Sequence, residues 1–334
     1  MEETVMFGDG PEFRQFLDAS YVLMEREIQS LDRIVYNVVR HKAVAQKMFP
    51  TVKIPEGMKQ HKVAIEVEAD PPKFDDNFLT EDLDEIRKEE KTFYPIYMHK
   101  DFAIDKVTID ASRSSNYYNL DAKALQLRGS TNTIVDYKER VIWRGYDIKG
   151  RSSANAQGSI DDNSKGILNT SNVQSFAAGA GADANITAAG DGPASIGAAV
   201  ATLVDDGYYG PYYFIMTPLV RSALGKNLNS TTHITDIERM QSMVDENGNK
   251  ILRGMFVTPY LINATETSST GSMVMIDPKT PMGEPTVVIG EVYPVTHYPT
   301  SQNSLFIKGK IIWAGCAMVL RPKAITIETD ITSS

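Results

Sequence analysis

The sequence predicts an α+β protein built around one long helix. Between Asn119 and Gly145 apolar residues recur at steps of three and four, which places them on one stripe of an α-helix. A two-stranded ribbon is expected within residues 60–106, and several short strands separated by turns follow residue 255. Helices and a mostly antiparallel sheet within one half of the chain favour α+β packing.

The N-terminal segment has a helical pattern over residues 13–47. The apolar residues that begin this pattern are Phe13, Phe16, Leu17 and Tyr21. Two interpretations stay open, because the apolar face fits either a helix packed on its own domain or an arm that covers a partner on another subunit. Pro50 and Pro55 end the pattern and begin an extended connection.

Two strands with an acidic segment between them are predicted for residues 60–106. Val63, Ile65 and Val67 alternate with polar or small residues, and residues 92–104 are rich in aromatic and β-branched side chains. The candidates for contact with another subunit in the acidic part are Asp82, Asp84, Glu85 and Glu89. Two strands have too little core to stand alone, so the ribbon is expected to lie along its own domain or a neighbouring copy.

The long helix has matching signals at both ends. Asn119 is a good N-cap, and Arg144 complements the negative C-terminal end of the helix dipole. Gly145 stands where a left-handed residue would stop the helix. Gly129 in the middle costs about 1 kcal/mol relative to alanine and suggests close packing or a bend.

The rest of the chain begins with a long Gly- and Ser-rich stretch at residues 150–192, which is typical of a functional or disordered loop. A helix is expected at 195–206, ended by Gly207, and a strand at 212–216. Thr217 and Pro218 are expected to open a third helix. Further strands are expected at 255–262, 272–276, 286–291, 304–313 and 317–320. Residues 324–327 are expected to return beside the long helix.

The amino-acid composition argues against several classes of function. The formal net charge of −9 argues against a surface that clamps a nucleic-acid backbone, although it does not exclude a container for nucleic acid. Cys316, the only cysteine, lies in an apolar run and is predicted to be a buried structural thiol. The first residues lack a signal-peptide pattern, and no apolar run reaches the ~18 residues of a membrane span, so a soluble chain made in the cytosol is expected.

Recognisable catalytic motifs are missing from the sequence. The five histidines have no metal-ligand spacing, and there is neither a Walker phosphate loop nor a G-x-S-x-G elbow. The glycines at 179–184 match a dinucleotide fingerprint only superficially, because no strand precedes them. We therefore predict no enzyme activity, no cofactor and no metal site. An uncatalogued α+β enzyme with its site in residues 150–192 is kept as an alternative.

Four stretches in a fixed order carry a family resemblance. They are YKERVIWRGYD at 137–147, KGILN at 165–169, GPYYFIMTP at 210–218 and IKGKIIWAGCAMVLRPKAITI at 307–327. In this order they resemble the shell proteins of tailed viruses with the Hong Kong 97 phage fold, which the encapsulin nanocompartments share. Each motif is weak alone, and it is their order along most of the chain that carries the resemblance.

The resemblance implies a Hong Kong 97-like fold with four parts: an N-terminal helical arm at 1–59, an extended β-hairpin E-loop at 60–106, a peripheral P-domain at 107–192 and 304–334 that includes the spine helix at 119–145, and an A-domain at 193–303. Some relatives form a Lys–Asn isopeptide bond between subunits. Lys59, Lys62 and Lys73 lie in or near the E-loop, but no residue here matches that motif well.

The implied function is a major capsid protein that self-assembles into an icosahedral shell around double-stranded DNA. The favoured alternative to it is an encapsulin-type shell around a cargo enzyme. The implied partners are copies of the chain in pentamers and hexamers, with separate scaffold, portal or decoration proteins, no membrane and no sequence-specific DNA contact. The expected location is the virion capsid after synthesis in the host cytoplasm, or a cytoplasmic particle in the alternative.

Overall fold

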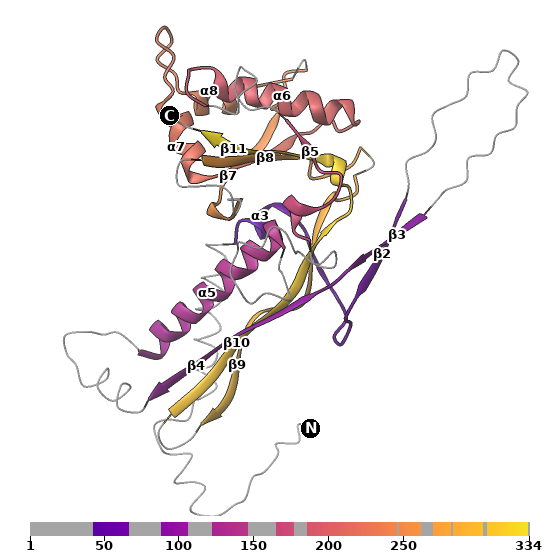
Figure 1. The fold of residues 1–334 in the computed structure, drawn as a ribbon, viewed down its shortest axis with the longest axis vertical. Coiled ribbons are helices and arrows are strands. Elements are labelled where there is room, and N and C mark those ends of the chain that lie inside the picture. The colour runs from indigo at the N-terminus through magenta and orange to yellow at the C-terminus, as the bar shows by residue number, and fades with distance from the viewer. Residues whose placement is uncertain are drawn as a thin grey trace, which may run out of the picture. The chain divides into compact units, whose positions relative to one another are not determined.

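The computed structural model describes residues 43–66, 88–105, 122–145, 165–176, 186–245, 247–261, 270–281, 283–302 and 306–332 (Figure 1). The helices are α3 (Ala45–Met48), α5 (Ala122–Arg144), α6 (Asp191–Asp205), α7 (Pro218–Lys226) and α8 (Asp236–Ser242), with short 3-10 turns at Ile167–Asn169, Pro259–Leu261 and Pro322–Ala324. The strands are β1 (Thr51–Lys53), β2 (His61–Glu66), β3 (Lys88–Phe93), β4 (Ile96–Asp105), β5 (Gln174–Ser175), β6 (Tyr212–Met216), β7 (Leu252–Val257), β8 (Thr270–Ile276), β9 (Val287–Gln302), β10 (Phe306–Val319) and β11 (Ile325–Thr332).

The chain divides into two compact units. The smaller contains residues 1–43, 97–137 and 293–314, and the larger contains residues 44–96, 138–292 and 315–334. Helix α5 and strands β9 and β10 contribute residues to both units. In the part of the smaller unit that the structure describes, β10 lies between β4 and β9. There the Phe102 ring of β4 stacks on the His297 ring of β9, with centroids 5.6 Å apart.

A five-stranded sheet with the order β5-β11-β8-β6-β7 forms the body of the larger unit. The β11/β8 and β8/β6 pairs are antiparallel, whereas the β11/β5 and β6/β7 pairs are parallel. The expectation of a mostly antiparallel sheet is therefore wrong. Helices α7 and α8 lie in the chain between β6 and β7, and such a crossover is what a parallel neighbour requires.

The central strands of this sheet are covered on both faces. In β6 the side chains of Phe214 and Met216 belong to one buried cluster, and those of Tyr213 and Ile215 belong to another. This alternation follows from the two-residue period of a strand. It explains why the expected strand at 212–216, which is confirmed, consists of consecutive apolar residues.

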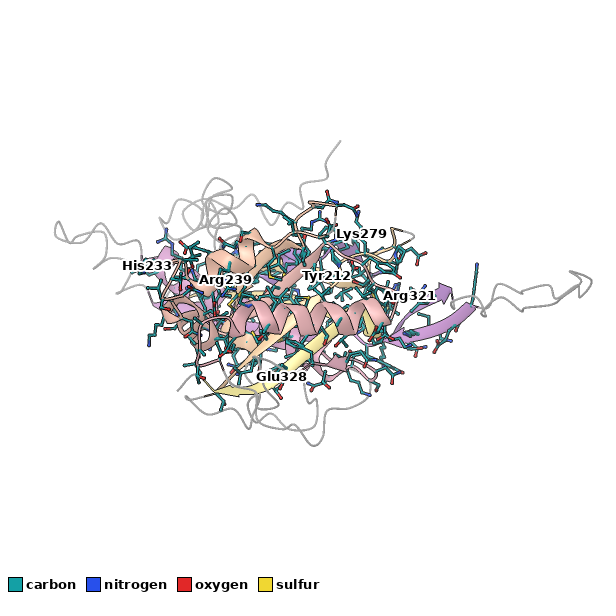
Figure 2. All side chains as sticks on the ribbon, turned by 90° about the horizontal axis from the view of Figure 1, so that it is seen from above. Tyr212, His233, Arg239, Lys279, Arg321 and Glu328 are labelled. Atoms are coloured by element: carbon teal, nitrogen blue, oxygen red, sulfur yellow. The ribbon has the colours of Figure 1, made fainter. Side chains whose placement is uncertain are left out.

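Helices α6, α7 and α8 cover one face of the sheet, and Figure 2 shows α6 lying across the strands. Their buried contributions are Ile196 and Leu203 of α6, Val220 and Leu224 of α7, and Ile237 and Met240 of α8. Helix α6 begins four residues earlier than expected. The Asp191 carboxylate accepts hydrogen bonds from the backbone N–H groups of Thr187 and Ala188, at 2.8 and 2.7 Å, and Pro193 is tolerated in a first turn.

The start of α7 was predicted from the sequence, whereas α8 was missed. Pro218 is the first residue of α7 after Thr217, as expected, although the Thr217 hydroxyl accepts from the Ser272 backbone N–H instead of capping the helix. Helix α8 was not predicted. Its signal is a capping box, because the Glu238 backbone N–H donates to the Thr235 hydroxyl while the Thr235 N–H donates to the Glu238 carboxylate.

The predicted long helix is confirmed as α5. Gly145 has the expected left-handed backbone at φ +78°, and its N–H donates to the Val141 carbonyl at 2.8 Å. The buried stripe consists of Leu127, Thr131, Ile134, Val135, Val141 and Ile142. Gly129 is exposed, and a Cβ there would meet no atom of the described chain within 4 Å. Close packing around Gly129 is therefore excluded within the described chain. Asn119 lies outside the described residues.

Strands β9 and β10 are much longer than the segments expected at 286–291, 304–313 and 317–320, with 16 and 14 residues. Strand β9 continues through Pro294, and among the described residues β1 pairs with it only at Ile289–Glu291. Expected strand 255–262 is displaced to β7 (252–257).

The C-terminal part of the chain contains β11 and the only cysteine. Strand β11 pairs with β8 and β5, and its first residue, Ile325, shares a buried cluster with Ile142 and Trp143 of α5.

Cys316 is only 4% exposed, which confirms the structural thiol, and burial raises its pKa to about 12. No helix in the described ranges has both the length and the apolar character needed to cross a membrane.

Candidate functional site

Of the eight predicted subunit-contact residues, the structure describes one. Glu89 lies in β3, is exposed, and stands opposite Ile65 of β2 in the strand register. The other predicted contact residues lie outside the described residues, namely Phe13, Phe16, Leu17, Tyr21, Asp82, Asp84 and Glu85. The loop at 179–184 and the histidine His41 also lie outside them. The contact role of all eight stays a prediction.

Strands β2 and β3 form a two-stranded ribbon, but the returning strand expected at residues 92–104 is wrong. The partner of β2 is β3 (Lys88–Phe93), and most of the expected strand forms β4, which lies beside β10. They pair antiparallel from His61 opposite Phe93 to Glu66 opposite Lys88. The alternation expected from the sequence is present, because Val63 and Ile65 are at least partly buried while Ala64 between them is exposed. The pair confirms the half-buried ribbon.

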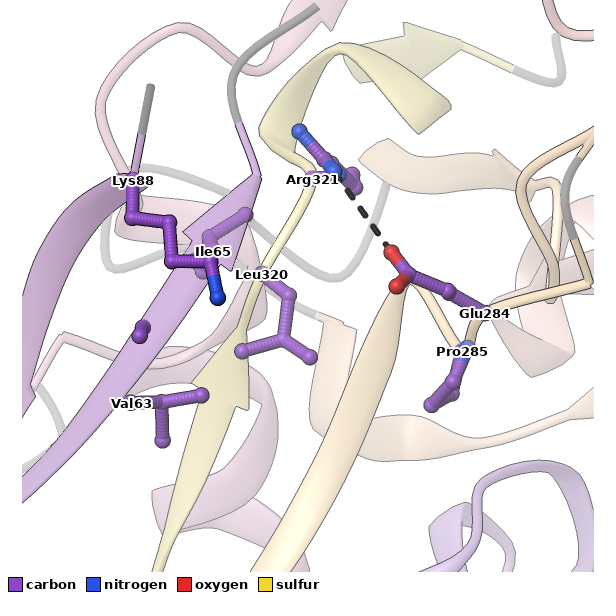
Figure 3. Close-up of a pocket in the computed structure, with 8 residues that line it drawn as sticks. Val63, Ile65, Lys88, Glu284, Pro285, Leu320 and Arg321 are labelled. Atoms are coloured by element: carbon purple, nitrogen blue, oxygen red, sulfur yellow. Dashed lines mark ion pairs between the residues drawn. The ribbon is translucent and has the colours of Figure 1, made fainter. Parts of the chain in front are cut away.

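The root of the ribbon is attached to its own chain. The Lys91 ammonium of β3 donates a hydrogen bond to the Leu320 carbonyl at 2.9 Å, and partial burial lowers the pKa of Lys91. Beside this contact lies a pocket of about 230 Å³, lined by Val63, Ala64, Ile65, Lys88, Glu284, Pro285, Leu320 and Arg321 (Figure 3). The Arg321 guanidinium and the Glu284 carboxylate form an ion pair across it at 3.5 Å. The sequence left open whether the ribbon lies on its own domain, and its root does.

A buried polar cluster lies at the C-terminal end of α5. The Lys138 ammonium contacts the Glu291 carboxylate of β9 at 2.5 Å, and both residues are at most 7% exposed. The Gln46 side-chain amide of α3 donates to the same carboxylate at 3.2 Å. Desolvation lowers the pKa of Lys138, while its contact with Glu291 acts in the opposite direction.

Glu139, the next residue along α5, is also fully buried. Its carboxylate accepts hydrogen bonds from the Ala45 backbone N–H, at 3.2 and 3.3 Å to the two oxygens, and from the Trp143 indole N–H at 3.2 Å. These donors stabilise the ionised form, and burial opposes it. Burial is the larger effect and raises the pKa of Glu139 to about 7.

The polar cluster fixes residues 45–54 to the body of the larger unit. Strand β1 pairs in parallel with β9, and the Ile54 N–H donates to the Glu291 carbonyl at 2.8 Å. The Phe49 ring packs edge-on against Trp143, with centroids 6.2 Å apart. We call residues 43–54 the anchor segment. Its elements α3 and β1 are attached to α5 and β9 by these contacts.

Sequence reasoning did not find this cluster, although one signal was present. Lys138 stands four residues after Ile134 and four before Ile142, which puts a charged residue on the apolar stripe of the predicted helix. A lysine in that position needs a buried acid. The acid, Glu291, is 153 residues away in the sequence, so the pattern of the helix could not identify it.

The described residues show no group of three or more histidine, cysteine, aspartate or glutamate side chains arranged to hold a metal ion. A second surface hollow, of about 250 Å³, lies between the turns at 209–211 and 277–281. Its Asp277 carboxylate accepts hydrogen bonds from the backbone N–H groups of Gly210 and Lys279. Those bonds serve to hold the two turns together.

Comparison with known proteins finds similarity at the level of structure. No protein-family model matches the sequence, and no curated protein does. A chain from the capsid of Myoviridae phage XM1 is similar, with a TM-score of 0.61 and 11% identity, covering 86% of this chain and 91% of that chain. A virus-like particle from Pyrococcus furiosus gives a TM-score of 0.57 and 13% identity, covering 91% of this chain and 99% of that chain.

The capsid of the native GTA particle is a third similar structure, with a TM-score of 0.55 and 9% identity, covering 87% of this chain and 91% of that chain. The chain has the Hong Kong 97 fold. The expected fold class is therefore confirmed, with its mixture of helices and sheets. Helix α5 (Ala122–Arg144) lies within the range expected for the spine helix, and β2 with β3 lies within residues 60–106, where the E-loop was expected.

Proposed function

We propose that the chain is a major capsid protein that self-assembles into an icosahedral virus shell enclosing double-stranded DNA. The carrying observation is the extent of the structural likeness, which covers 86% of this chain and 91% of a chain from a phage capsid. Nearly the whole of both chains therefore shares one fold. The role is structural, and the proposed partners are copies of the chain in pentamers and hexamers, with separate scaffold, portal or decoration proteins.

Exposed apolar side chains support contacts between copies. Several aromatic or branched residues are more than half exposed in the described single chain, namely Tyr97, Tyr209, Val244 and Tyr298. Scattered apolar residues are normal on a surface. These four are nevertheless candidate contacts, because they are large and more than half exposed. Assembly into a shell would cover such residues and stabilise the subunit by mass action.

The charge of the chain fits a container more than a nucleic-acid clamp. With a net charge of −9, the subunit offers DNA no general attraction. The proposed shell therefore encloses DNA without sequence-specific binding. In this proposal the chain is made in the host cytoplasm and ends in the virion capsid.

Particle formation is the test of this proposal. Expressed alone, the full chain should elute in the void volume of a sizing column and appear in electron micrographs as closed shells that are empty or loosely filled. Expressed with its genomic neighbours, it should yield particles that protect DNA of uniform length from nuclease. One dominant co-purifying enzyme would instead identify a cargo compartment. A chain that stays monomeric at high concentration would contradict both.

The acidic residues between the ribbon strands provide a second prediction. We expect that changing Asp82, Asp84 and Glu85 to their amides, together with Glu89→Gln, weakens the salt dependence of assembly while leaving subunit folding unchanged. Exposed carboxylates contribute little to folding, but across a subunit contact they pair with lysine or arginine and are screened by salt. The measurement is particle yield against salt concentration, followed by light scattering.

Glu90→Gln is the matched control for this variant. Glu90 is a neighbouring exposed carboxylate, but it already pairs with Lys62 within the chain at 3.0 Å. Its removal should leave the salt dependence of assembly unchanged. The same salt response in the parent and the multiple variant would show that the acidic residues serve only for solvation.

A further inference from the structure

The buried cluster on α5 contains more acids than bases. It holds two carboxyl groups, Glu139 and Glu291, and one ammonium, Lys138, all of which are almost inaccessible to water. If all three were ionised, these described groups together would carry one net negative charge. An uncompensated charge in an apolar site is costly, and a titratable group in that position takes up a proton instead. The arrangement therefore favours one bound proton.

The contacts indicate which carboxyl holds that proton. Glu291 is the partner of the Lys138 ammonium, which favours its ionised form. Glu139 accepts from the neutral N–H groups of Ala45 and Trp143. The other charges that act on Glu139 are Lys138 on its own helix and Lys47 on α3, and both are outweighed by burial, which raises the pKa of Glu139 to about 7.

Glu139 is buried by contact with the anchor segment itself. Both of its carboxylate oxygens accept from the Ala45 N–H, and Gln46 of the same short helix contacts Glu291. Detachment of α3 would expose the Glu139 carboxyl to water, where it titrates at its ordinary value near 4.5. The proton and the anchor segment are therefore linked.

We propose that Glu139 is a proton-linked attachment site for the anchor segment, which binds a proton when residues 43–54 are attached and releases it when they detach. Attachment is then strongest below about pH 4.5, weakens as the pH rises from there to about 7, and changes little above pH 8. The proposal concerns the single chain and is independent of the proposed shell function.

The size of the effect follows from linkage. With a pKa of about 7 when attached and 4.5 when detached, both forms bind the proton below pH 4 and neither does above pH 8. Between pH 6 and pH 8 the detached form is already ionised, so each rise in pH favours detachment until the attached form has lost its proton as well. The equilibrium constant for detachment should therefore rise about tenfold over this interval.

Hydrogen–deuterium exchange of the full-length chain tests this. Peptides covering residues 43–54 are followed at pH 6, 7 and 8, and each rate is divided by the intrinsic chemical exchange rate at that pH. We expect about a tenfold increase in detachment for the unaltered chain. Peptides covering β8 (Thr270–Ile276), which is buried in the sheet, should show no such increase.

Glu139→Gln separates the titration from other effects of pH. Glutamine keeps the length of the side chain and an oxygen that accepts from Ala45, but it does not titrate, so the pH response of residues 43–54 should disappear. Glu90→Gln, at an exposed position of β3, should keep the full response. An unchanged detachment constant in the unaltered chain, or an equal response in Glu139→Gln, would overturn the proposal. If Glu139→Gln does not fold, a detachment constant in the unaltered chain that does not level off near pH 7 would also overturn it.

Discussion

Val135→Asp should leave no folded soluble protein. Val135 is fully buried in the middle of α5, in the stripe that the sequence predicted to face a core. A buried carboxylate without a partner costs several kcal/mol, which is comparable with the roughly 5–15 kcal/mol that stabilise a whole domain. The yield of soluble protein and its circular dichroism spectrum measure the outcome.

Leu125→Asp is the matched control on the same helix. Leu125 is 47% exposed, so the same introduced charge remains in water and should cost little. If Leu125→Asp folds and Val135→Asp yields no folded protein, the destabilisation is caused by burial of the introduced charge. Recovery of soluble, assembled Val135→Asp would show that the stripe does not face a core.

Lys138→Met should destabilise the larger unit by about 3–5 kcal/mol, because it removes the ammonium that compensates the charge of the buried Glu291 carboxylate. The methionine fills a similar volume, so the loss is due to the missing charge more than to a cavity. Urea denaturation of the dissociated subunit, followed by Trp fluorescence, gives the change in the free energy of unfolding.

The double variant Lys138→Met with Glu291→Gln should recover much of this loss, since neither partner then carries a charge. Lys62→Met is the surface control. It breaks the Lys62–Glu90 ion pair, whose side chains are 55% and 63% exposed, and should change the free energy of unfolding by less than about 1 kcal/mol. Equal destabilisation by Lys62→Met and Lys138→Met would show that the buried ion pair contributes no more to the free energy of unfolding than the exposed one.

The parts of the fold that the sequence predicted correctly depend on local signals. Helix α5 ends at Gly145 because glycine adopts the left-handed conformation, and α7 begins at Pro218 because proline fits a first turn. Strand β6 was recognisable because both of its faces are apolar. The parallel pairing of β6 with β7, in contrast, depends on the path of α7 and α8, which no local pattern contains.

The errors have physical reasons of the same kind. The strand expected at 286–291 continues to Gln302 as β9, and its pairing with β10 is a contact between segments that the local pattern does not contain. The pair of Lys138 and Glu291 joins residues far apart in the chain, so only the folded structure reveals it. For the candidate contact site, the sequence predicted an acidic tip between two strands for Glu89, whereas the structure places it in strand β3. What Glu89 contacts in a neighbouring copy depends on an interface that a single chain does not contain.

The burial of Cys316 has a practical consequence for chemical labelling. With a pKa raised to about 12, its thiol is almost entirely protonated at neutral pH, and the thiolate is the form that maleimides and iodoacetamides attack. Thiol reagents should therefore react very little with Cys316 in the native chain. A single cysteine introduced at an exposed position, such as Tyr209, accepts a fluorophore or a spin label without first removing Cys316 from the interior of β10.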